Sequence, residues 1–212
     1  MPEEMVFGDK DGNHSFLMLF KDGNRIDLTI FPLDKLETEF ERDSLSILLL
    51  DKDNLFEGLP ASSDKDYLIK HPVEKEFTDC CNEFWWVSTN VAKGLWRNEI
   101  TYAKDMLEIP VRTMFMKIIE WHIGIKTDFT VSFGKSGRNM KDYISPDLYD
   151  KILSTYPDGN LNNIWNSLFI MTGIFSELAN KIAQTMNFNY NIDEEYNVTQ
   201  YLKSVHSMTT EK

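Results

Sequence analysis

The sequence FKDGNRIDLTI, residues 20–30, decides how the first part of this chain folds. Asp22 and Gly23 stand between two apolar stretches. Such a pair is typical of the primed turn of a β-hairpin, which needs positive φ angles that Gly and Asp tolerate. A lone acid, Asp27, then interrupts a run that otherwise has the pattern of a buried strand. The stretch therefore predicts an antiparallel hairpin over residues 14–31.

Asp27 lies on the more polar face of the second predicted strand. Side chains alternate between the two faces of a strand, so the turn separates Ile26, Leu28 and Ile30 from Arg25, Asp27 and Thr29. Two interpretations of Asp27 follow: an acid on the wet face of an edge strand, or a functional carboxylate that faces a cleft. Spacing alone favours the first.

Length and composition are typical of a globular protein. The chain has 212 residues, 42% hydrophobic and 13% aromatic, so it can bury a core in one or two domains. It has no stretch of 18 apolar residues and no signal-peptide pattern at its start, so we expect a cytoplasmic protein without a membrane partner. Cys80 and Cys81 are adjacent, and a bond between them would be strained, so we expect reduced thiols in or near the core.

The charge is strongly negative and unevenly distributed. The formal net charge is −12, and residues 1–79 contain 19 Asp and Glu against 9 Lys and Arg. Such a surface repels nucleic acid, so we expect no nucleic-acid partner. A negative cleft raises the local concentration of a polycationic ligand, although acidic surfaces also serve solubility alone.

Two compositional regions are joined by residues 58–76. There, Pro and small polar residues interrupt both the two-residue period of strands and the period of helices, which predicts a linker. Residues 1–57 contain the hairpin and a Leu-rich helical run predicted within residues 33–50. The later part is helical, with Pro110 at a first helical position and a weakening at Gly173. The predicted helices span residues 74–94, 97–108, 110–126, 146–155, 160–186 and 193–206. The sequence thus predicts an α+β chain, in which part of a sheet precedes an all-helical bundle.

Five blocks of sequence resemble one enzyme family. They are the hairpin residues 20–29, LDKD at 50–53, FTDCCNEFW at 77–85, KGLWRNE at 93–99 and WHI at 121–123. In this order they resemble the aminoglycoside 6-adenylyltransferases, the streptomycin-modifying branch of the polymerase-beta-like nucleotidyltransferases. The resemblance covers nearly the whole chain. It implies the C-terminal part of the mixed catalytic sheet in residues 1–57 and a helical substrate-binding domain in residues 77–212.

One part of the family pattern is unmatched. Family members carry, upstream of this hairpin, a Gly-Ser helix start and an Asp-x-Asp strand that supply phosphate contacts and two of three metal-binding carboxylates. This chain has no Gly-Ser dipeptide, and its Asp-Lys-Asp sequences at 9–11, 51–53 and 64–66 lie in polar stretches that predict loops. We therefore expect a family member without its N-terminal catalytic segment, in an inactive truncated form.

By this resemblance, Asp27 is the third carboxylate and binds the metal ion nearest the attacking hydroxyl. Transfer of AMP from ATP to a hydroxyl uses two Mg²⁺ ions about 4 Å apart, and Mg²⁺ prefers carboxylate oxygens. A general base would help the drug hydroxyl to attack, and the candidates are Asp105, which we prefer, and Glu99. The two lie six residues apart, about 240° around a continuous helix, so both cannot face one site. A solvated helix face is the alternative role.

Basic residues are candidates for contact with a triphosphate. Lys93, Arg97 and Lys104 share one face of a continuous helix, since four and then seven residues advance it by about 40° and 340°. A salt-bridged surface is the alternative. Lys135 lies in SFGKSG, residues 132–137, which lacks the first Gly and the strand-to-helix frame of a phosphate loop. Lys135 can still reach a phosphate from a flexible loop.

Glu83, Trp85, Trp121 and His122 are the expected substrate-binding residues. Aromatic residues at helical spacing usually fill a core, but one can stack on a guanidinium, which streptomycin carries twice. Trp85 is preferred for this role because it follows Glu83 by two residues in a family block. His122 is either a base or a core histidine, and the structural role is favoured because no acid pairs with it in the sequence.

The resemblance implies an aminoglycoside 6-adenylyltransferase, which transfers AMP from Mg-ATP to the 6-hydroxyl of streptomycin and confers antibiotic resistance. The alternative is a non-catalytic remnant that still binds an aminoglycoside or a nucleotide. An upstream Gly-Ser and Asp-x-Asp segment is the feature that separates these two functions.

Overall fold

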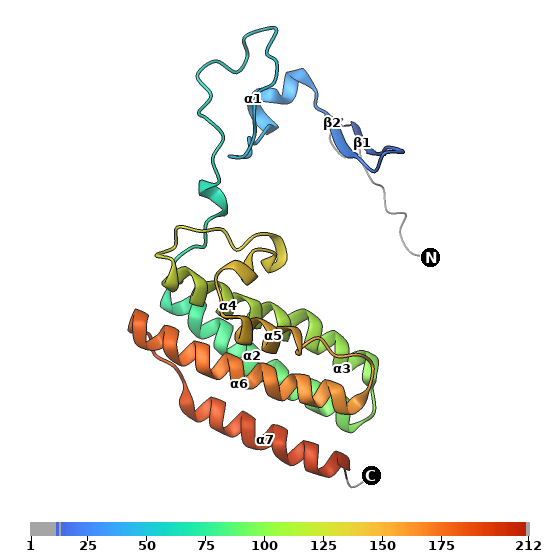
Figure 1. The fold of residues 1–212 in the computed structure, drawn as a ribbon, viewed down its shortest axis with the longest axis vertical. Coiled ribbons are helices and arrows are strands. Elements are labelled where there is room, and N and C mark those ends of the chain that lie inside the picture. Colours follow the sequence, from blue (N-terminus) through green and yellow to red (C-terminus); the bar gives the residue numbers. More distant parts are fainter. Residues whose placement is uncertain (1–11, 13, 211–212) are drawn as a thin grey trace. The chain divides into compact units, whose positions relative to one another are not determined.

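The computed structural model describes residues 12 and 14–210 of the chain. The Asp-Lys-Asp sequence at 9–11, expected in a loop, lies outside the described residues. The chain divides into two compact units, residues 1–63 and 64–212 (Figure 1). The point of division falls within residues 58–76, the range that the sequence predicts as a linker. Each unit is described by itself.

The first unit contains the predicted hairpin, formed by β1 (His14–Leu19) and β2 (Arg25–Ile30) in antiparallel register with Leu17 opposite Asp27. The predicted primed turn is wrong. The Phe20 N–H donates to the Asn24 carbonyl and the Gly23 N–H donates to the Phe20 carbonyl, so the loop has three residues. Of the loop residues 20–24, only Gly23 has a positive φ, 85°, which a residue without Cβ adopts without strain.

The helix predicted within residues 33–50 is mostly absent. Only a 3₁₀ turn (Leu33–Lys35) and the short α1 (Leu36–Glu39) form. Beyond them, the carbonyl groups of residues 44 and 45 bond to residues far along the chain: the Ser62 hydroxyl donates to the Leu45 carbonyl, and the Ser63 N–H to the Ser44 carbonyl. These contacts replace a helical ladder, and the Leu-rich run stays exposed, with Leu49 at 91%.

The second unit is a helical bundle, and the α+β fold class is confirmed. Its helices, most with ends close to the predicted ones, are α2 (Glu74–Trp96), α3 (Ile100–Met106), α4 (Arg112–Lys126), α5 (Pro146–Leu153), α6 (Leu161–Met186) and α7 (Ile192–Thr210). Short 3₁₀ turns lie at Lys65–Tyr67, Lys135–Gly137 and Met140–Asp142. The α6 helix continues through Gly173, so the predicted weakening there is wrong. None of the described helices is long and apolar enough to cross a membrane.

The predicted helices at 97–108 and 110–126 are divided differently. The chain breaks after α2 at Asn98, which has a φ of 60°, and α3 begins only at Ile100. Pro110 does not open a helix but lies inside a π-helical turn, Leu107–Val111, that runs directly into α4. Proline lacks an N–H and its ring collides with the carbonyl four residues earlier, and a wider π turn accommodates both defects.

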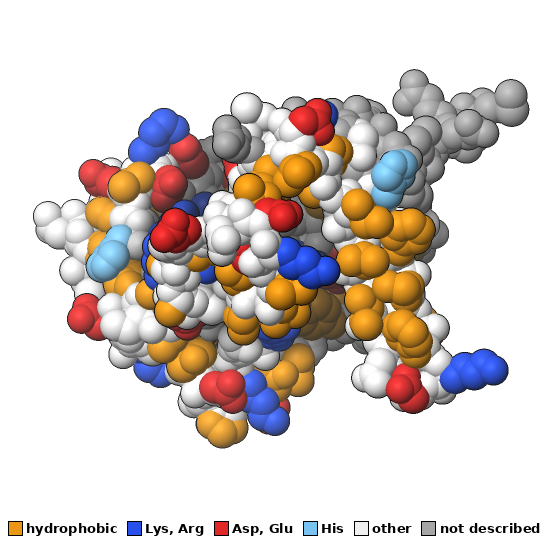
Figure 2. Space-filling view, turned by 90° about the horizontal axis from the view of Figure 1, so that it is seen from above, with side chains coloured by type: hydrophobic (Ala, Val, Ile, Leu, Met, Phe, Trp, Pro, Cys, Tyr) orange, Lys and Arg blue, Asp and Glu red, His pale blue; other side chains and the backbone are white. Residues whose placement is uncertain are grey.

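The hydrophobic core lies in the second unit and surrounds α2. Phe84 of α2 stacks on Phe175 of α6, with ring centroids 3.6 Å apart and planes nearly parallel, and Trp85 meets both rings edge-on. α7 packs mainly along α2. Cys80 and Cys81 are free thiols buried in this core, as expected from the sequence. By contrast, both strands of the hairpin expose apolar side chains. In the view of Figure 2, hydrophobic side chains, drawn in orange, gather on part of the visible surface.

Arg112 connects the start of α4 to the end of α5. This guanidinium is buried, with 7% of the residue exposed, and donates to the Glu108 carboxylate and to the hydroxyl and carbonyl of Thr155. It also lies 3.8 Å from the centroid of the Tyr156 ring. Every one of these partners is within the second unit, so Arg112 fixes the position of α5 on the bundle.

Replacing Arg112 by Met should lower the free energy of unfolding by about 3 kcal/mol, because it breaks the partly buried ion pair with Glu108 and removes both hydrogen bonds to Thr155. Urea unfolding measures the change. Lys75→Met is the matched control, since Lys75 pairs with Asp79 on an exposed surface and such pairs contribute little. An equal, small change in both variants would contradict the structural role of Arg112.

Candidate functional site

Asp27 is an exposed carboxylate held by one neighbour. Its side chain is 56% exposed and receives two hydrogen bonds from Arg25, from Nε at 3.0 Å and from Nη2 at 3.1 Å. Arg25 is two residues earlier on β2, so both side chains lie on one face, as the alternation predicts. The carboxylate raises the pKa of Arg25.

A two-metal centre needs more carboxylates than the described residues gather. Among residues 12 and 14–210, no group of three or more His, Cys, Asp or Glu side chains could hold a metal ion. Each Asp51 oxygen accepts one backbone N–H, from Phe56 and from Leu55, and these hydrogen bonds lower the pKa of Asp51. Asp27 alone does not fit a pair of Mg²⁺ ions, and no catalytic step through a metal follows from these residues.

The two candidate bases lie at the start and near the end of α3. Glu99 precedes the helix and is exposed, and its backbone N–H donates to the Gly94 carbonyl. Asp105 is exposed in the last turn of the same helix. Because Glu99 is outside the helix, its backbone being non-helical, their spacing in the sequence no longer fixes the angle between the two side chains. The choice between them therefore stays a prediction.

The predicted basic stripe is not formed by one helix. Lys93 is in the last turn of α2 and Arg97 just beyond its end, both exposed, whereas Lys104 is on α3 after the break at Asn98. Lys104 also donates to Glu108 and to the Pro157 carbonyl. These bonds correspond to the alternative interpretation of the basic residues, a salt-bridged surface. Lys135 is exposed in a 3₁₀ turn that follows Gly134, not in a phosphate loop.

The two tryptophans expected to bind substrate are core residues. Trp85 is 1% exposed and its indole N–H donates to the Tyr190 hydroxyl, so stacking of its ring on a drug guanidinium is excluded in this packing. Trp121 is 3% exposed against Phe77. Both burials follow the ordinary role of aromatic residues at helical spacing. Glu83 is exposed on α2.

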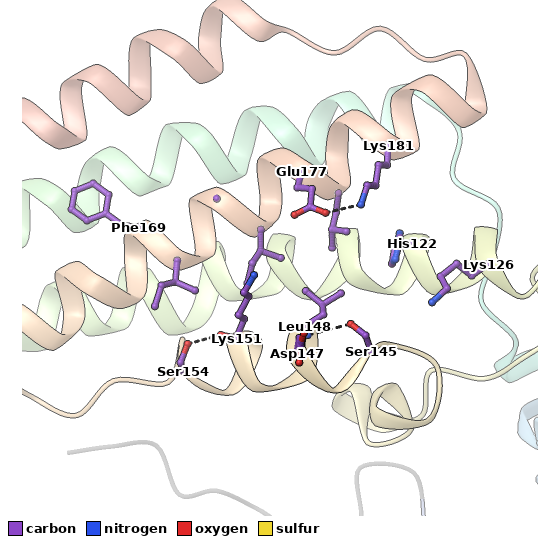
Figure 3. A pocket seen from close by; sticks show the side chains of 14 residues that line it. His122, Lys126, Ser145, Asp147, Leu148, Lys151, Ser154, Phe169, Glu177 and Lys181 are labelled. Carbon is purple, nitrogen blue, oxygen red and sulfur yellow. Dashed lines mark hydrogen bonds and ion pairs between the residues drawn. The ribbon is translucent and has the colours of Figure 1, made fainter.

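His122 lies at the wall of the largest cavity described in the helical unit, about 660 Å³ between α4, α5 and α6 (Figure 3). Such a volume suits a small-molecule ligand. The floor is apolar, with Leu148, Phe169 and Ile174 among its residues. Ser145 positions one wall, because its hydroxyl accepts the Leu148 N–H and caps α5.

Charged side chains line the same cavity. They are Lys126 from α4, Asp147 and Lys151 from α5, and Glu177 and Lys181 from α6. The Lys181 ammonium is 2.6 Å from the Glu177 carboxylate, and Lys126 donates to the Tyr143 carbonyl. Burial, followed by the charges of Lys126 and Lys181, lowers the pKa of His122. The neutral imidazole can therefore accept a hydrogen bond, while the lysines favour anionic groups on a ligand.

The sequence did not single out Lys126, Lys151, Glu177 or Lys181. The spacing of His122 to Lys126, and of Glu177 to Lys181, is four residues, which places each pair on one helix face. Nothing in the sequence shows that these faces meet across α5. Only the packing of three helices brings them to one cavity.

Comparisons with known proteins agree on one family. The family model described as "Streptomycin adenylyltransferase" matches residues 1–205. This chain belongs to that family. The resemblance found in the sequence is thereby confirmed, and with it the class of enzyme, a nucleotidyltransferase.

Three aminoglycoside 6-adenylyltransferases are similar to this streptomycin adenylyltransferase family member. The protein of Bacillus subtilis is 37% identical over 97% of this chain and 73% of its own length. The protein of Campylobacter jejuni is 38% identical over 92% of this chain and 68% of its own length. The protein of Staphylococcus aureus is 34% identical over 96% of this chain and 73% of its own length. A crystal structure of an aminoglycoside 6-adenyltransferase from Bacillus subtilis matches with a TM-score of 0.61 at 32% identity, over 97% of this chain and 75% of that one.

Removing a neighbouring positive charge should raise the pKa of His122. We expect Lys126→Met to move it toward the ordinary value of about 6.5, because the Lys126 charge disfavours the imidazolium. NMR titration of the imidazole measures this shift. Lys203→Met is the control, since Lys203 does not line this cavity.

The lowered pKa also makes folding depend on pH. Between its folded pKa and about 6.5, only the unfolded chain protonates His122, so the stability gained from the neutral imidazole is complete above 6.5 and lost as the pH falls through the folded pKa. His122→Gln should reduce this loss. An unchanged pH profile of unfolding would contradict the assignment.

Proposed function

We propose that this protein is an aminoglycoside 6-adenylyltransferase that confers resistance to a streptomycin-like drug. In the proposed reaction, a drug hydroxyl attacks the α-phosphorus of ATP, AMP is transferred and pyrophosphate leaves. The observation that carries this proposal is the family match over residues 1–205, together with three relatives of that name at 34–38% identity. ATP with Mg²⁺ as the donor, and the cytoplasm as the place of the reaction, belong to the same proposal.

Asp27 is the catalytic carboxylate that this chain contributes in the proposal. The family resemblance aligns it with the third metal-binding acid, and its exposure on β2 leaves it accessible. Such a centre needs two further carboxylates, because the charge that develops on the transferred phosphoryl group must be neutralised. We therefore propose that the 212 residues by themselves turn over at a negligible rate.

An acidic surface on α2 supports a polycationic substrate. Glu83 lies beside Glu76 and Asp79 in a depression of about 340 Å³, opposite Lys117 of α4. Asp79 is already paired with Lys75, so three carboxylates against two ammonium groups leave an excess of negative charge, which attracts a cation and speeds its encounter with the protein. Glu83 is therefore retained as a drug-binding residue, and Lys93 and Arg97, both exposed, as contacts for the triphosphate. Lys135 is kept as a further phosphate contact from its exposed turn.

Transfer activity tests the proposal in two proteins. The first is the 212-residue chain, and the second is the same chain extended by the Gly-Ser and Asp-x-Asp segment that the family carries upstream of this hairpin. With ATP, Mg²⁺ and streptomycin, we expect pyrophosphate release and adenylylated drug only from the extended chain. Asp27→Asn in it should lower the rate by about 10² or more, while Asp22→Asn, at the hairpin loop, is the control.

Ordinary turnover by the 212 residues alone would overturn the proposed inactivity. An inactive extended chain that binds drug or ATP would favour a non-catalytic binding protein. An active Asp27→Asn variant would return Asp27 to the role of a solvated acid.

Asp105 is proposed as the general base and Glu99 as its alternative. In the extended chain, Asp105→Asn should lower the chemical step by about 10² to 10⁴ and leave ATP affinity unchanged, because proton abstraction contributes only in the transition state. The acidic limb of the pH–rate profile should disappear with it. If Glu99→Gln removes this limb and Asp105→Asn keeps it, the two roles are reversed.

A further inference from the structure

The cavity at His122 has no role in the proposed reaction. It measures about 660 Å³ between α4, α5 and α6, and none of the residues with a part in that reaction lines it. We refer to it as the His122 cavity. Its two ends differ in chemistry, because Phe169 lies near one end in Figure 3, and His122 and Lys126 lie near the other.

The His122 cavity is long enough for an extended ligand. Its lining residues on α6 run from Phe169 to Lys181, twelve positions that advance a helix by about 18 Å. The apolar lining residues are Leu148, Phe169, Ile170, Ile174 and Leu178. Three of them follow one another on α6 at intervals of four residues and so share a face. An apolar body therefore has a continuous surface to lie on.

Three ammonium groups from three helices line the same cavity. They belong to Lys126 of α4, Lys151 of α5 and Lys181 of α6. Folding brings these like charges together, which is unfavourable unless each has a partner. Lys181 pairs with Glu177, and Lys126 donates to the Tyr143 carbonyl. Lys151 is exposed, and its ammonium group makes no hydrogen bond or ion pair within the described part of the chain.

The two acids of the cavity do not cancel these charges. Glu177 is already engaged by Lys181. Asp147 is in the first turn of α5, where the positive end of the helix dipole compensates a carboxylate. Three ammonium groups against two carboxylates leave one positive charge in excess. After burial, the charges of Lys126 and Lys181 lower the pKa of His122, and each outweighs the opposite effect of Glu177.

We propose that the His122 cavity binds a small organic monoanion, a carboxylate with an apolar body. The carboxylate accepts hydrogen bonds from Lys126 and Lys151, and the body extends along α6 toward Phe169. A monoanion matches the single positive charge in excess, whereas a cation meets repulsion. The ligand therefore has the opposite charge to the polycationic drug. The inference does not rest on the proposed function.

Calorimetric titration of the 212-residue chain with phenylbutyrate, without ATP, Mg²⁺ or drug, tests the inference. This probe joins a carboxylate to a phenyl ring through a short apolar chain, and we expect saturable binding. Butyrate has the same carboxylate without the ring and should bind at least about tenfold more weakly, because it buries less apolar surface. Phenylbutylamine has the same body with the opposite charge and should show no binding.

Lys151→Gln removes the ammonium group that has no partner. We expect the affinity for phenylbutyrate to fall about fivefold or more, since hydrogen bonds between charged groups are the strong ones. The melting temperature should not change, because the side chain is exposed. Lys203→Gln is the matched control: it removes the same charge from an exposed position of α7 outside this cavity, and should bind as the original chain does.

The imidazole of His122 shows whether the probe lies in this cavity. Saturation with phenylbutyrate should raise the pKa of His122, because a nearby carboxylate favours the imidazolium. Lys126, Lys181 and Glu177 act on this imidazole in both states, and the other charged residues of the cavity, Asp147 and Lys151, are also unchanged. NMR titration with and without the probe measures the difference.

Absence of saturable binding, or equal binding of phenylbutylamine, overturns the inference. So does an affinity that Lys151→Gln weakens no more than Lys203→Gln does. Binding that leaves the pKa of His122 unchanged also rejects it, because the probe would then lie elsewhere. Adenylyl transfer by the extended chain is measured separately, and its failure would reject the proposed function without changing this result.

Discussion

The stacking of Phe84 on Phe175 is the contact on which the helical unit depends. The two rings lie at 3.6 Å and nearly parallel, and they join α2 to α6 at the centre of the bundle. Trp85 adds two edge-on contacts, an arrangement that aromatic quadrupoles favour. Because α3, α4, α6 and α7 all contact α2, this pair of helices sets the frame of the unit.

Polar groups at the edge of this core position the elements that form the helical unit and the His122 cavity. The indole N–H of Trp85 holds the Tyr190 hydroxyl, which fixes the chain just before α7. Arg112 fixes the end of α5 through Thr155, and α5 forms one wall of the His122 cavity.

The first unit depends on different physics. Its described part contributes no side chain to the buried hydrophobic core, and the apolar residues of both hairpin strands remain exposed. A two-stranded hairpin alone is marginally stable in water. The Arg25 pair with Asp27 is exposed and adds little to stability. Asp27 is accordingly placed by strand register and by one charged neighbour, in contrast to the buried support of α5 beside the His122 cavity.

The sequence by itself determined the family, the fold class, most of the helices and the alternation that puts Arg25 beside Asp27, because local periodicity and short distinctive blocks carry that information. The local sequence pattern did not predict the three-residue loop at Gly23, the π turn at Pro110 or the break at Asn98. At these positions the backbone conformation depends on packing against neighbouring elements. The family block suggested Trp85 for stacking on a drug guanidinium, whereas its packing against Phe84 and Phe175 gives it the core role that helical spacing favours. The His122 cavity was decided only by the tertiary structure, since it joins three helices whose facing residues are far apart in the chain.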